Sequence, residues 1–330
     1  MNCFIIAEAG VNHNGDLSIA YKLCDAAKFA GANAVKFQIF DPDKLVTKEA
    51  KKADYQNEND KSSSSQYEML KKLALSNDEF KSISDYCQKI DIDFMATAFD
   101  EDSVDFLHSL GVNVVKIPSG EITNLPYLIK ISKLWKNIIM STGMATFEEI
   151  KKAYDVLSKY GATVTVLHCT TEYPAPLETV NLKAMQFLGE KLGIKYGYSD
   201  HTKGIEVPIA AVALGASVIE KHFTLDKDMD GPDHKASIEP VELKTMVDAI
   251  RNVEIALGVA DKVVNDCEMR NRLVARKSIV AKKAIKKGEV LTVDNITTKR
   301  PGTGISPMKW FEVIGTNAVR DFEQDELIEI

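Results

Sequence analysis

Apolar and polar residues follow two different periods along this chain. Short apolar runs rich in β-branched residues predict buried strands at 4–9, 34–39, 93–98, 114–118, 138–142, 164–169, 195–199 and 218–223. Segments with apolar residues three and four apart predict amphipathic helices after most of them, including 17–30, 101–110, 146–160, 181–192, 205–214 and 241–257. Strands that alternate with helices predict crossover units and a parallel sheet.

Four glycines mark the junctions between predicted helices and strands. Gly31, Gly111, Gly161 and Gly215 each end a helical stretch and precede a β-branched run. A glycine just past a helix end adopts positive φ at low cost, so each of these positions predicts a helix stop. Eight strand–helix units within residues 1–258 favour an α/β fold of the (β/α)8 TIM-barrel type, with a doubly wound sheet as the alternative.

The composition changes after Gly258. Residues 278–330 contain short strand-like pieces and turns, which predict a small β-rich domain joined by a linker over 259–277. Residues 270–300 hold ten Lys or Arg and two acidic residues, whereas the whole chain has 41 basic and 48 acidic residues and a net charge of −7. An acidic chain is a poor nucleic-acid binder. The basic stretch is therefore either a solvated surface or a cationic cover over an anionic substrate.

Other features bound the cellular setting. The five cysteines are widely spaced with no C-x-x-C pair, which predicts reduced thiols in a cytoplasmic protein. The longest apolar stretch, 207–219, is too short to span a bilayer, and no signal peptide precedes the first strand. Residues 41–66, with serines at 62–65, predict either a solvated loop or a loop that folds over the barrel mouth.

Polar residues gather where the predicted strands end. In a (β/α)8 barrel the catalytic groups lie at the carboxyl ends of the strands and in the loops that follow. A strand built only for packing would not place Lys36 and Gln38 on one face. The full set is Glu8, Lys36, Gln38, Thr97, Lys116, Ser119, Glu121, Ser141, Thr171, Tyr173, Ser199, His201 and His222.

These residue types favour particular chemistry. His201 and His222, at neighbouring strand ends, have the chemistry to share one divalent metal, although the alternative of two ordinary buried histidines stays open. The lysines and hydroxyls favour a small anionic substrate, such as a phosphorylated one. A P-loop and a G-x-G-x-x-G fingerprint are both missing from the sequence, so neither nucleotide fold is supported.

The same segments resemble the sialic acid (nonulosonate) synthases over nearly the whole chain. The motifs that carry the resemblance lie at 5–15, 35–38, 116–121, 141–144, 168–174, 198–202, 220–224, 231–233 and 299–302. The resemblance implies a TIM barrel followed by a small antifreeze-like (SAF) domain. It also implies a transferase that condenses phosphoenolpyruvate with an N-acetylated mannosamine-type sugar into a nine-carbon 2-keto acid and phosphate.

The resemblance also implies roles for single residues. The phosphoenolpyruvate carboxylate and phosphate would be held by Lys36, Thr97, Lys116, Ser119, Ser141 and Ser199. The sugar would contact Glu8, Gln38, Tyr173, Asp233 and Arg300, with Arg300 supplied by the small domain of the partner in a domain-swapped homodimer. His201 and His222 would hold Mn²⁺ or Mg²⁺, and Glu121 would be the catalytic carboxylate.

The expected sugar follows from two differences between this chain and the neuraminate-making members. Thr171 stands where some neuraminate-making members have Asn, and residues 231–237 also differ from theirs. Both features look more like the legionaminate branch, which uses 2,4-diacetamido-2,4,6-trideoxymannose. N-acetylmannosamine is the second expectation and a pseudaminate precursor the third. A hypothesis of another class is a non-catalytic carbohydrate- or ice-binding protein, for which the lysines, histidines and Glu121 would have no purpose.

Overall fold

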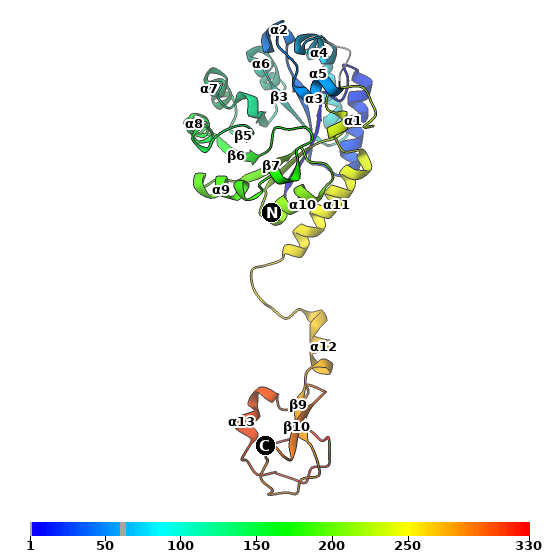
Figure 1. Cartoon of the computed structure of the whole chain (residues 1–330), viewed down its shortest axis with the longest axis vertical. Helices are drawn as coiled ribbons and strands as arrows, with labels where there is room; N and C mark the ends of the chain where they lie inside the picture. The colour runs from blue at the N-terminus through cyan, green and yellow to red at the C-terminus, as the bar shows by residue number, and fades with distance from the viewer. Residues whose placement is uncertain (1, 60–63) are drawn as a thin grey trace. The chain divides into compact units, whose positions relative to one another are not determined.

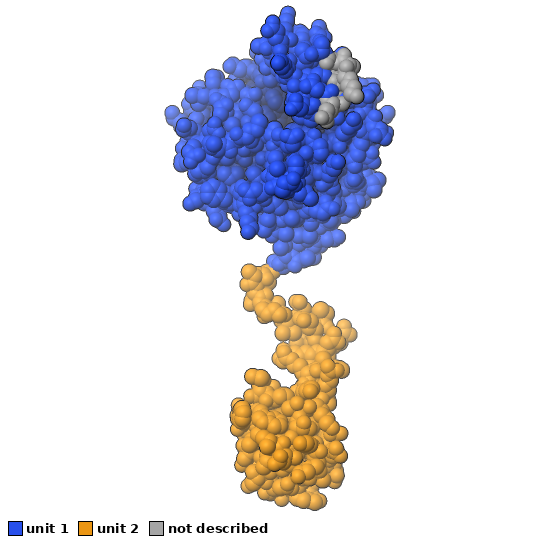
Figure 2. Space-filling model, viewed as in Figure 1, with its two compact units in different colours: residues 1–258 blue, residues 259–330 orange. Residues whose placement is uncertain are grey.

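The chain forms two compact units, residues 1–258 and 259–330, which are coloured separately in Figure 2. The computed structural model describes residues 2–59 and 64–330, so Ser62 and Ser63 of the serine run lie outside the described residues. Within these ranges, none of the helices combines the length and the apolarity that crossing a bilayer requires.

The first unit is a (β/α)8 barrel, which confirms the predicted fold class (Figure 1). Its eight parallel strands pair in the order β3-β2-β1-β8-β7-β6-β5-β4, and β3 and β4 lie side by side where the circle closes. Every predicted strand is present within two residues of its expected bounds. The strands are β1 (Phe4–Gly10), β2 (Ala34–Ile39), β3 (Asp93–Ala98), β4 (Val114–Ile117), β5 (Asn137–Ser141), β6 (Thr163–His168), β7 (Tyr196–Asp200) and β8 (Val218–His222).

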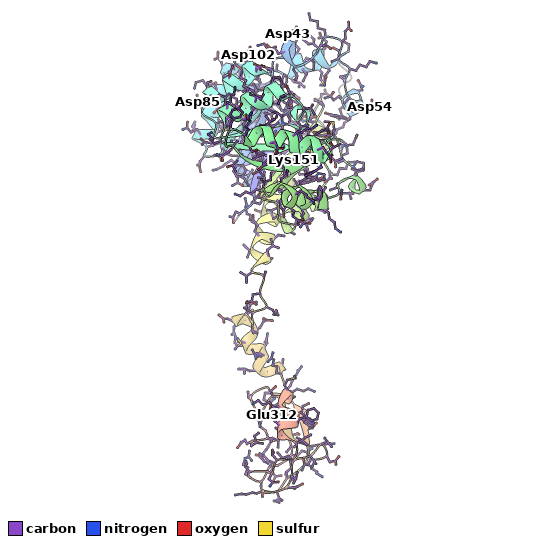
Figure 3. All side chains as sticks on the ribbon, turned by 90° about the vertical axis from the view of Figure 1, so that its left-hand side faces the viewer. Asp43, Asp54, Asp85, Asp102, Lys151 and Glu312 are labelled. Carbon is purple, nitrogen blue, oxygen red and sulfur yellow. The ribbon has the colours of Figure 1, made fainter. Side chains whose placement is uncertain are left out.

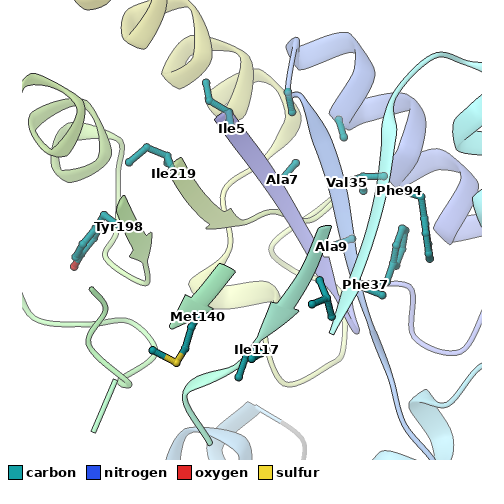
Figure 4. Close-up of a cluster of buried hydrophobic side chains, with 14 of the residues drawn as sticks. Ile5, Ala7, Ala9, Val35, Phe37, Phe94, Ile117, Met140, Tyr198 and Ile219 are labelled. Atoms are coloured by element: carbon teal, nitrogen blue, oxygen red, sulfur yellow. The ribbon is translucent and has the colours of Figure 1, made fainter. Parts of the chain in front are cut away.

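The main helices surround this sheet. They are α1 (Leu17–Ala30), α5 (Asn77–Lys89), α6 (Glu101–Ser109), α7 (Leu125–Leu134), α8 (Phe147–Ser158), α9 (Lys183–Leu192), α10 (Glu206–Ala213) and α11 (Pro240–Leu257). Strand side chains such as Ile5, Val35 and Phe37 point outward and form the buried layer between sheet and helices (Figure 4). Charged side chains such as Asp85 and Lys151 lie on the exposed sides of α5 and α8 (Figure 3).

The four junction glycines have the conformation that the sequence predicts. Gly31, Gly111, Gly161 and Gly215 have φ values of 81°, 74°, 78° and 94°. A residue with a Cβ atom is strained at such positive φ values, which favours glycine. Gly31 is the C-cap of α1, and the other three glycines lie one or two residues past the C-caps of α6, α8 and α10, where the chain turns toward the next strand.

The inner face of the barrel is divided into an apolar and a polar layer. Successive residues of a strand point to opposite sides, so every second residue faces the barrel interior. One interior layer is an apolar cluster of Ile6, Ala34, Met95, Ile139, Leu167 and Val218. Two residues further along, the interior is polar, with Glu8, Lys36, Thr97, Ser141 and Glu220, and Cys169 lies at the same level just past the end of β6. The sheet therefore closes one side of the polar layer with a hydrophobic plug.

The described parts of the segment 41–66, residues 41–59 and 64–66, are partly helical. It contains the short helices α2 (Pro42–Leu45) and α3 (Asp54–Asn59), and α4 (Gln66–Leu73) begins at its end. Asp41 caps α2 by accepting a hydrogen bond from the backbone of Asp43 at 3.1 Å. Leu45 and Val46 of this segment are partly buried and pack against a buried cluster of residues outside it, made of Val11, Phe40, Met69, Leu70 and Leu73.

The second unit is small and rich in extended chain. β9 (Ser278–Ala281) and β10 (Ile296–Lys299) form an antiparallel pair, and the short η4 (Pro307–Lys309) and α13 (Trp310–Val313) follow. Its core is Ile279, Ala281, Ile285, Leu291, Ile296, Val313, Ala318, Phe322 and Ile328. Residues 259–277, expected to be a linker, contain the helix α12 (Asp266–Ala275), which has no buried residue.

Candidate active site

A cavity of about 170 Å³ opens at the carboxyl ends of the barrel strands. Eleven of the predicted site residues line it, and they come from all parts of the barrel sequence. They are Glu8, Lys36, Gln38, Thr97, Lys116, Ser119, Ser141, Tyr173, Ser199, His201 and His222. The fold thus brings together residues that are up to 214 positions apart in the sequence. The most distant pair, Glu8 and His222, lie opposite each other on the adjacent strands β1 and β8.

The inner part of the cavity holds a buried network of two lysines and two carboxylates. Lys36 Nζ lies 2.7 Å from Glu8 Oε2 and 3.6 Å from Glu220 Oε2. Lys116 Nζ lies 3.2 Å from Glu220 Oε1, which also accepts a hydrogen bond from Ser199 Oγ at 2.8 Å. All four charged side chains are at most 5% exposed. Buried charges need such partners, because an isolated one would be very costly.

Two opposing effects decide which groups of this network are charged: burial disfavours the charged forms, and pairing with an opposite charge favours them. Burial raises the pKa of Glu8. The neighbouring Lys36 acts to lower this pKa, and the neighbouring Glu220 acts to raise it. Burial also acts to raise the pKa of Glu220, but Lys116 and Lys36 outweigh it and bring that pKa to about 2. Burial lowers the pKa of Lys116. Glu220 is therefore the fixed negative charge, and Glu8 is the carboxylate that takes up a proton most readily.

Hydroxyl groups complete this end of the cavity. Ser119 Oγ accepts a hydrogen bond from the Gly143 backbone N–H at 2.9 Å and lies 3.2 Å from Cys169 Sγ. Ser141 Oγ and Thr171 Oγ1 are buried and have no hydrogen-bond partner in the part of the chain that the structure describes. Unsatisfied buried hydroxyls are costly in a folded protein, so these two atoms fit a site that is completed by a polar ligand.

The other part of the cavity is aromatic. The rings of His201 and His222 have centroids 5.6 Å apart, and the Tyr173 ring lies 4.2 Å from His201 and 5.7 Å from His222. His201 Nδ1 is 2.6 Å from the Thr170 carbonyl oxygen, which makes Nδ1 the protonated nitrogen and leaves the lone pair on Nε2. Burial lowers the pKa of both histidines, so both rings are neutral.

These two imidazoles have the donor chemistry of a divalent metal site. Nδ1 of His222 is buried and has no hydrogen-bond partner among the residues described. No group of three or more His, Cys, Asp or Glu within residues 2–59 and 64–330 is arranged to hold a metal. Two neutral imidazoles fit an incomplete set of protein ligands, in which substrate or water oxygens fill the other positions.

Three predicted site residues do not line the cavity. Glu121 belongs to η1 (Ser119–Glu121), next to the lining residues, and Asn124 donates a hydrogen bond to its carboxylate at 2.6 Å. Asp233 is buried in the loop after β8, where burial and the nearby Glu8 raise its pKa to about 7. Arg300 belongs to the second unit and donates through Nε to the Ala275 carbonyl oxygen at 3.0 Å.

Sequence reasoning assigned no role to several residues of the cavity. Glu220 is the most important, and the signal for it is present, because it lies two residues before His222 on the same face of β8. Cys169 comes directly after β6 and two residues after Leu167, which faces the barrel interior, so the same alternation predicts that Cys169 faces it too. Phe99 and Met144 also line the cavity, but they lie in loops, where strand alternation gives no information.

Comparison with known proteins gives consistent matches. The NeuB family model matches residues 23–262 and the SAF domain model matches residues 276–329. The chain is 54% identical to an N,N'-diacetyllegionaminic acid synthase of Campylobacter jejuni over 98% of both chains. It is 49% identical to a Legionella pneumophila protein of the same name over 96% of this chain and 90% of that protein.

A solved structure of an N-acetylneuraminic acid synthetase from Leptospira borgpetersenii, in complex with citrate, is also similar. It has a TM-score of 0.72 and 35% identity, and the match covers 82% of this chain and 90% of that chain.

Proposed function

The chain belongs to the NeuB family and ends in a SAF domain, and from this premise we propose that it is a nonulosonic acid synthase. The reaction joins phosphoenolpyruvate to an open-chain N-acetylated amino sugar and releases phosphate. The observation that carries the proposal is the two-part cavity at the carboxyl ends of the strands, with buried lysines in one part and a Tyr173–His201–His222 cluster in the other.

The lysine part suits phosphoenolpyruvate. Lys36 and Lys116 supply positive charge in a dry environment, where it acts more strongly on an anion than in water. Ser141 Oγ, which lacks a partner in the described structure, is available to donate a hydrogen bond to a carboxylate or phosphate oxygen. Thr97, Ser119 and Ser199 add further hydroxyls around the same space.

The aromatic part suits the sugar. His201 and His222 would hold a divalent ion such as Mn²⁺ or Mg²⁺, and Glu8, Gln38 and Tyr173 would contact the sugar. When bound, such an ion supplies Lewis acidity at the carbonyl oxygen of the sugar. The neutral state of both imidazoles supports this assignment, because a protonated histidine cannot ligate a metal.

The reaction needs proton transfer and charge stabilisation from this chain. C3 of phosphoenolpyruvate attacks the aldehyde carbon, the aldehyde oxygen takes up a proton and becomes a hydroxyl, and water adds at C2, where positive charge develops. We assign Glu121 as the base that takes a proton from this water, and the Asn124 hydrogen bond fixes its carboxylate. The tetrahedral intermediate then expels phosphate, whose charge Lys36 and Lys116 stabilise.

We assign the sugar as 2,4-diacetamido-2,4,6-trideoxymannose. The two relatives described above carry the name of the corresponding synthase, and Thr171 and residues 231–237 agree with that branch. N-acetylmannosamine is the second candidate, and a pseudaminate precursor is the third. Hydrophobic fit to a C6 methyl group alone gives a discrimination of about 1–3 kcal/mol, so activity with the second sugar is expected to be weaker rather than zero.

We further propose that a homodimer completes the site, with Arg300 of one chain acting at the barrel of the other. The second unit leaves Met308 92% exposed and Phe311 88% exposed, and α12 exposes Met269, Leu273 and Val274. Exposed apolar side chains on so small a unit favour a partner surface that covers them. A guanidinium fork would then clamp the substrate only in the assembled dimer.

The test is phosphate release from phosphoenolpyruvate with each of the three sugars and Mn²⁺. We expect the highest kcat/KM with the diacetamido sugar and loss of activity in excess EDTA, restored by added Mn²⁺. A higher kcat/KM for N-acetylmannosamine would reverse the assignment of the sugar, and full activity in EDTA would remove the metal. Binding of a sugar without any phosphate release would favour the non-catalytic binding protein instead.

A further inference from the structure

An aromatic stack connects the segment 41–66 to the cavity. Tyr55, in α3, lies with its ring 5.0 Å from the ring of Tyr173 at an interplanar angle of 29°. The Tyr173 ring is in turn 4.2 Å from that of His201. Asp54, the first residue of α3, is labelled in Figure 3. Tyr55 of helix α3, Tyr173 and His201 therefore form a chain of neighbouring rings, in which Tyr173 and His201 line the cavity and Tyr55 does not.

A second contact fixes α3 above the same end of the cavity. Asn59, the last residue of α3, donates a hydrogen bond from Nδ2 to the Pro232 carbonyl oxygen at 2.8 Å. Pro232 precedes Asp233, the buried carboxyl that we expect to contact the sugar. The short helix is thus held at its first turn by Tyr173 and at its last residue by the loop that carries Asp233.

The side chain of Tyr55 is partly buried and has charged residues near its hydroxyl. Burial raises the pKa of Tyr55, and Asp233 and Glu172 raise it further, so the phenol stays protonated. Gln56 Nε2 lies 3.4 Å from the Tyr55 hydroxyl oxygen. A protonated, partly buried phenol near Asp233 is part of the electrostatic surroundings of the sugar-binding end.

We propose that Tyr55 is a positioning residue for the amino sugar, which acts by holding the Tyr173 ring against His201. The inference rests on the proposed function, because it concerns the sugar-binding end of that cavity. Loss of the Tyr55 ring leaves one face of Tyr173 without a contact and lets it turn away from His201. The phosphoenolpyruvate end should change less, because Lys36 and Lys116 are held by their own ion pairs with Glu8 and Glu220.

The test compares Tyr55→Ala and Tyr55→Phe by steady-state kinetics in both substrates. Stacked aromatic pairs contribute modestly, so we expect the sugar KM of Tyr55→Ala to rise roughly tenfold, with the phosphoenolpyruvate KM within about twofold of wild type. Tyr55→Phe keeps the ring and should restore most of the sugar KM. The matched control is Tyr67→Ala in α4, whose hydroxyl bonds Asp43 at 3.0 Å, and it should leave both KM values unchanged.

The outcomes separate this inference from the function it rests on. Wild-type protein without synthase activity on any of the three sugars would overturn the proposed function itself. An active wild type together with an unchanged sugar KM in Tyr55→Ala would overturn only the role of Tyr55. An equal rise of both KM values, or a fall in thermal stability with the same kinetic loss in Tyr67→Ala, would show a merely structural role and would also overturn it.

Discussion

Glu220 is the residue on which the charge balance of the cavity depends. It lies between Lys36 and Lys116 and accepts a hydrogen bond from Ser199. Its single negative charge offsets part of the positive charge of the two lysines, and Lys36 also pairs with Glu8. An incoming phosphoenolpyruvate adds negative charge to the same lysines, so substrate binding and the internal ion pairs are coupled.

Glu220→Gln should therefore destabilise the free protein and increase the benefit of a bound anion. Breaking a buried ion pair leaves an uncompensated charge and typically costs about 3–5 kcal/mol in the free energy of unfolding. We expect inorganic phosphate to recover more stability in this variant than in wild type, measured by denaturant unfolding with and without phosphate. Glu148→Gln, at an exposed position, is the matched control. An equal phosphate effect in wild type and Glu220→Gln would contradict this account.

Glu121→Gln tests the proposed base. The substitution keeps the shape and the oxygen that accepts from Asn124, but it removes the group that takes a proton from water. We expect kcat to fall roughly 10²–10⁴-fold with the dissociation constant for phosphoenolpyruvate nearly unchanged. Turnover close to that of wild type would mean that Glu121 is only structural.

At the scale of elements, the alternation along the strands predicts which residues face the barrel interior, whereas the loops carry no periodic signal of this kind. The eight strands and the inward positions of Lys36, Lys116 and His222 follow from a period of two residues. Helix α3 has no such signal, because its sequence Asp-Tyr-Gln-Asn-Glu-Asn has a single aromatic residue and no apolar face. Its contacts with Tyr173 and Pro232 are tertiary, and one sequence does not reveal them.

The loop between β1 and α1 makes the barrel sensitive to acid. His13 is fully buried beside Phe37 and Phe80, with ring centroids 6.0 Å and 6.4 Å away, and its Nδ1 accepts a hydrogen bond from the Gly15 backbone N–H. Burial lowers the pKa of His13 from 6.5 to about 4. Between these two values the unfolded chain binds a proton that the folded chain does not, so the free energy of unfolding falls as the pH falls.

His13→Asn should remove this dependence. Asn Oδ1 replaces the acceptor at Nδ1 and cannot be protonated. Between pH 7 and pH 4 the wild type should lose about 3 kcal/mol more unfolding free energy than the variant. Denaturant unfolding at a series of pH values measures both slopes, and parallel slopes would show that His13 does not titrate in this way.

At the scale of the whole molecule, the composition of the chain predicted a second unit but not how it acts. The basic stretch 270–300 coincides with the start of the SAF match and contains Arg300. Charge alone does not distinguish a solvated surface from a cover over an active site. Met308 and Phe311 are exposed in this unit, but in the sequence they look like core residues. The identity of an apolar residue does not indicate whether its own chain or another chain covers it.

Complementation between two inactive variants tests whether Arg300 acts across a dimer. Arg300→Ala and His201→Ala should each be inactive alone. Unfolded together and refolded as mixed dimers, they should regain activity, because the intact barrel of the Arg300→Ala chain receives Arg300 from its partner. If the mixture has no activity although native mass spectrometry confirms that mixed dimers are present, Arg300 does not act in trans.

The most direct test of the central claim is the reaction itself in H₂¹⁸O. The protein is incubated with phosphoenolpyruvate, 2,4-diacetamido-2,4,6-trideoxymannose and Mn²⁺, and both products are analysed by mass spectrometry. Water that adds at C2 leaves the phosphorus–oxygen bonds intact, so the account predicts a nine-carbon 2-keto acid together with phosphate that carries no ¹⁸O. Labelled phosphate, or no nine-carbon acid with this sugar or either of the two alternatives, would contradict it.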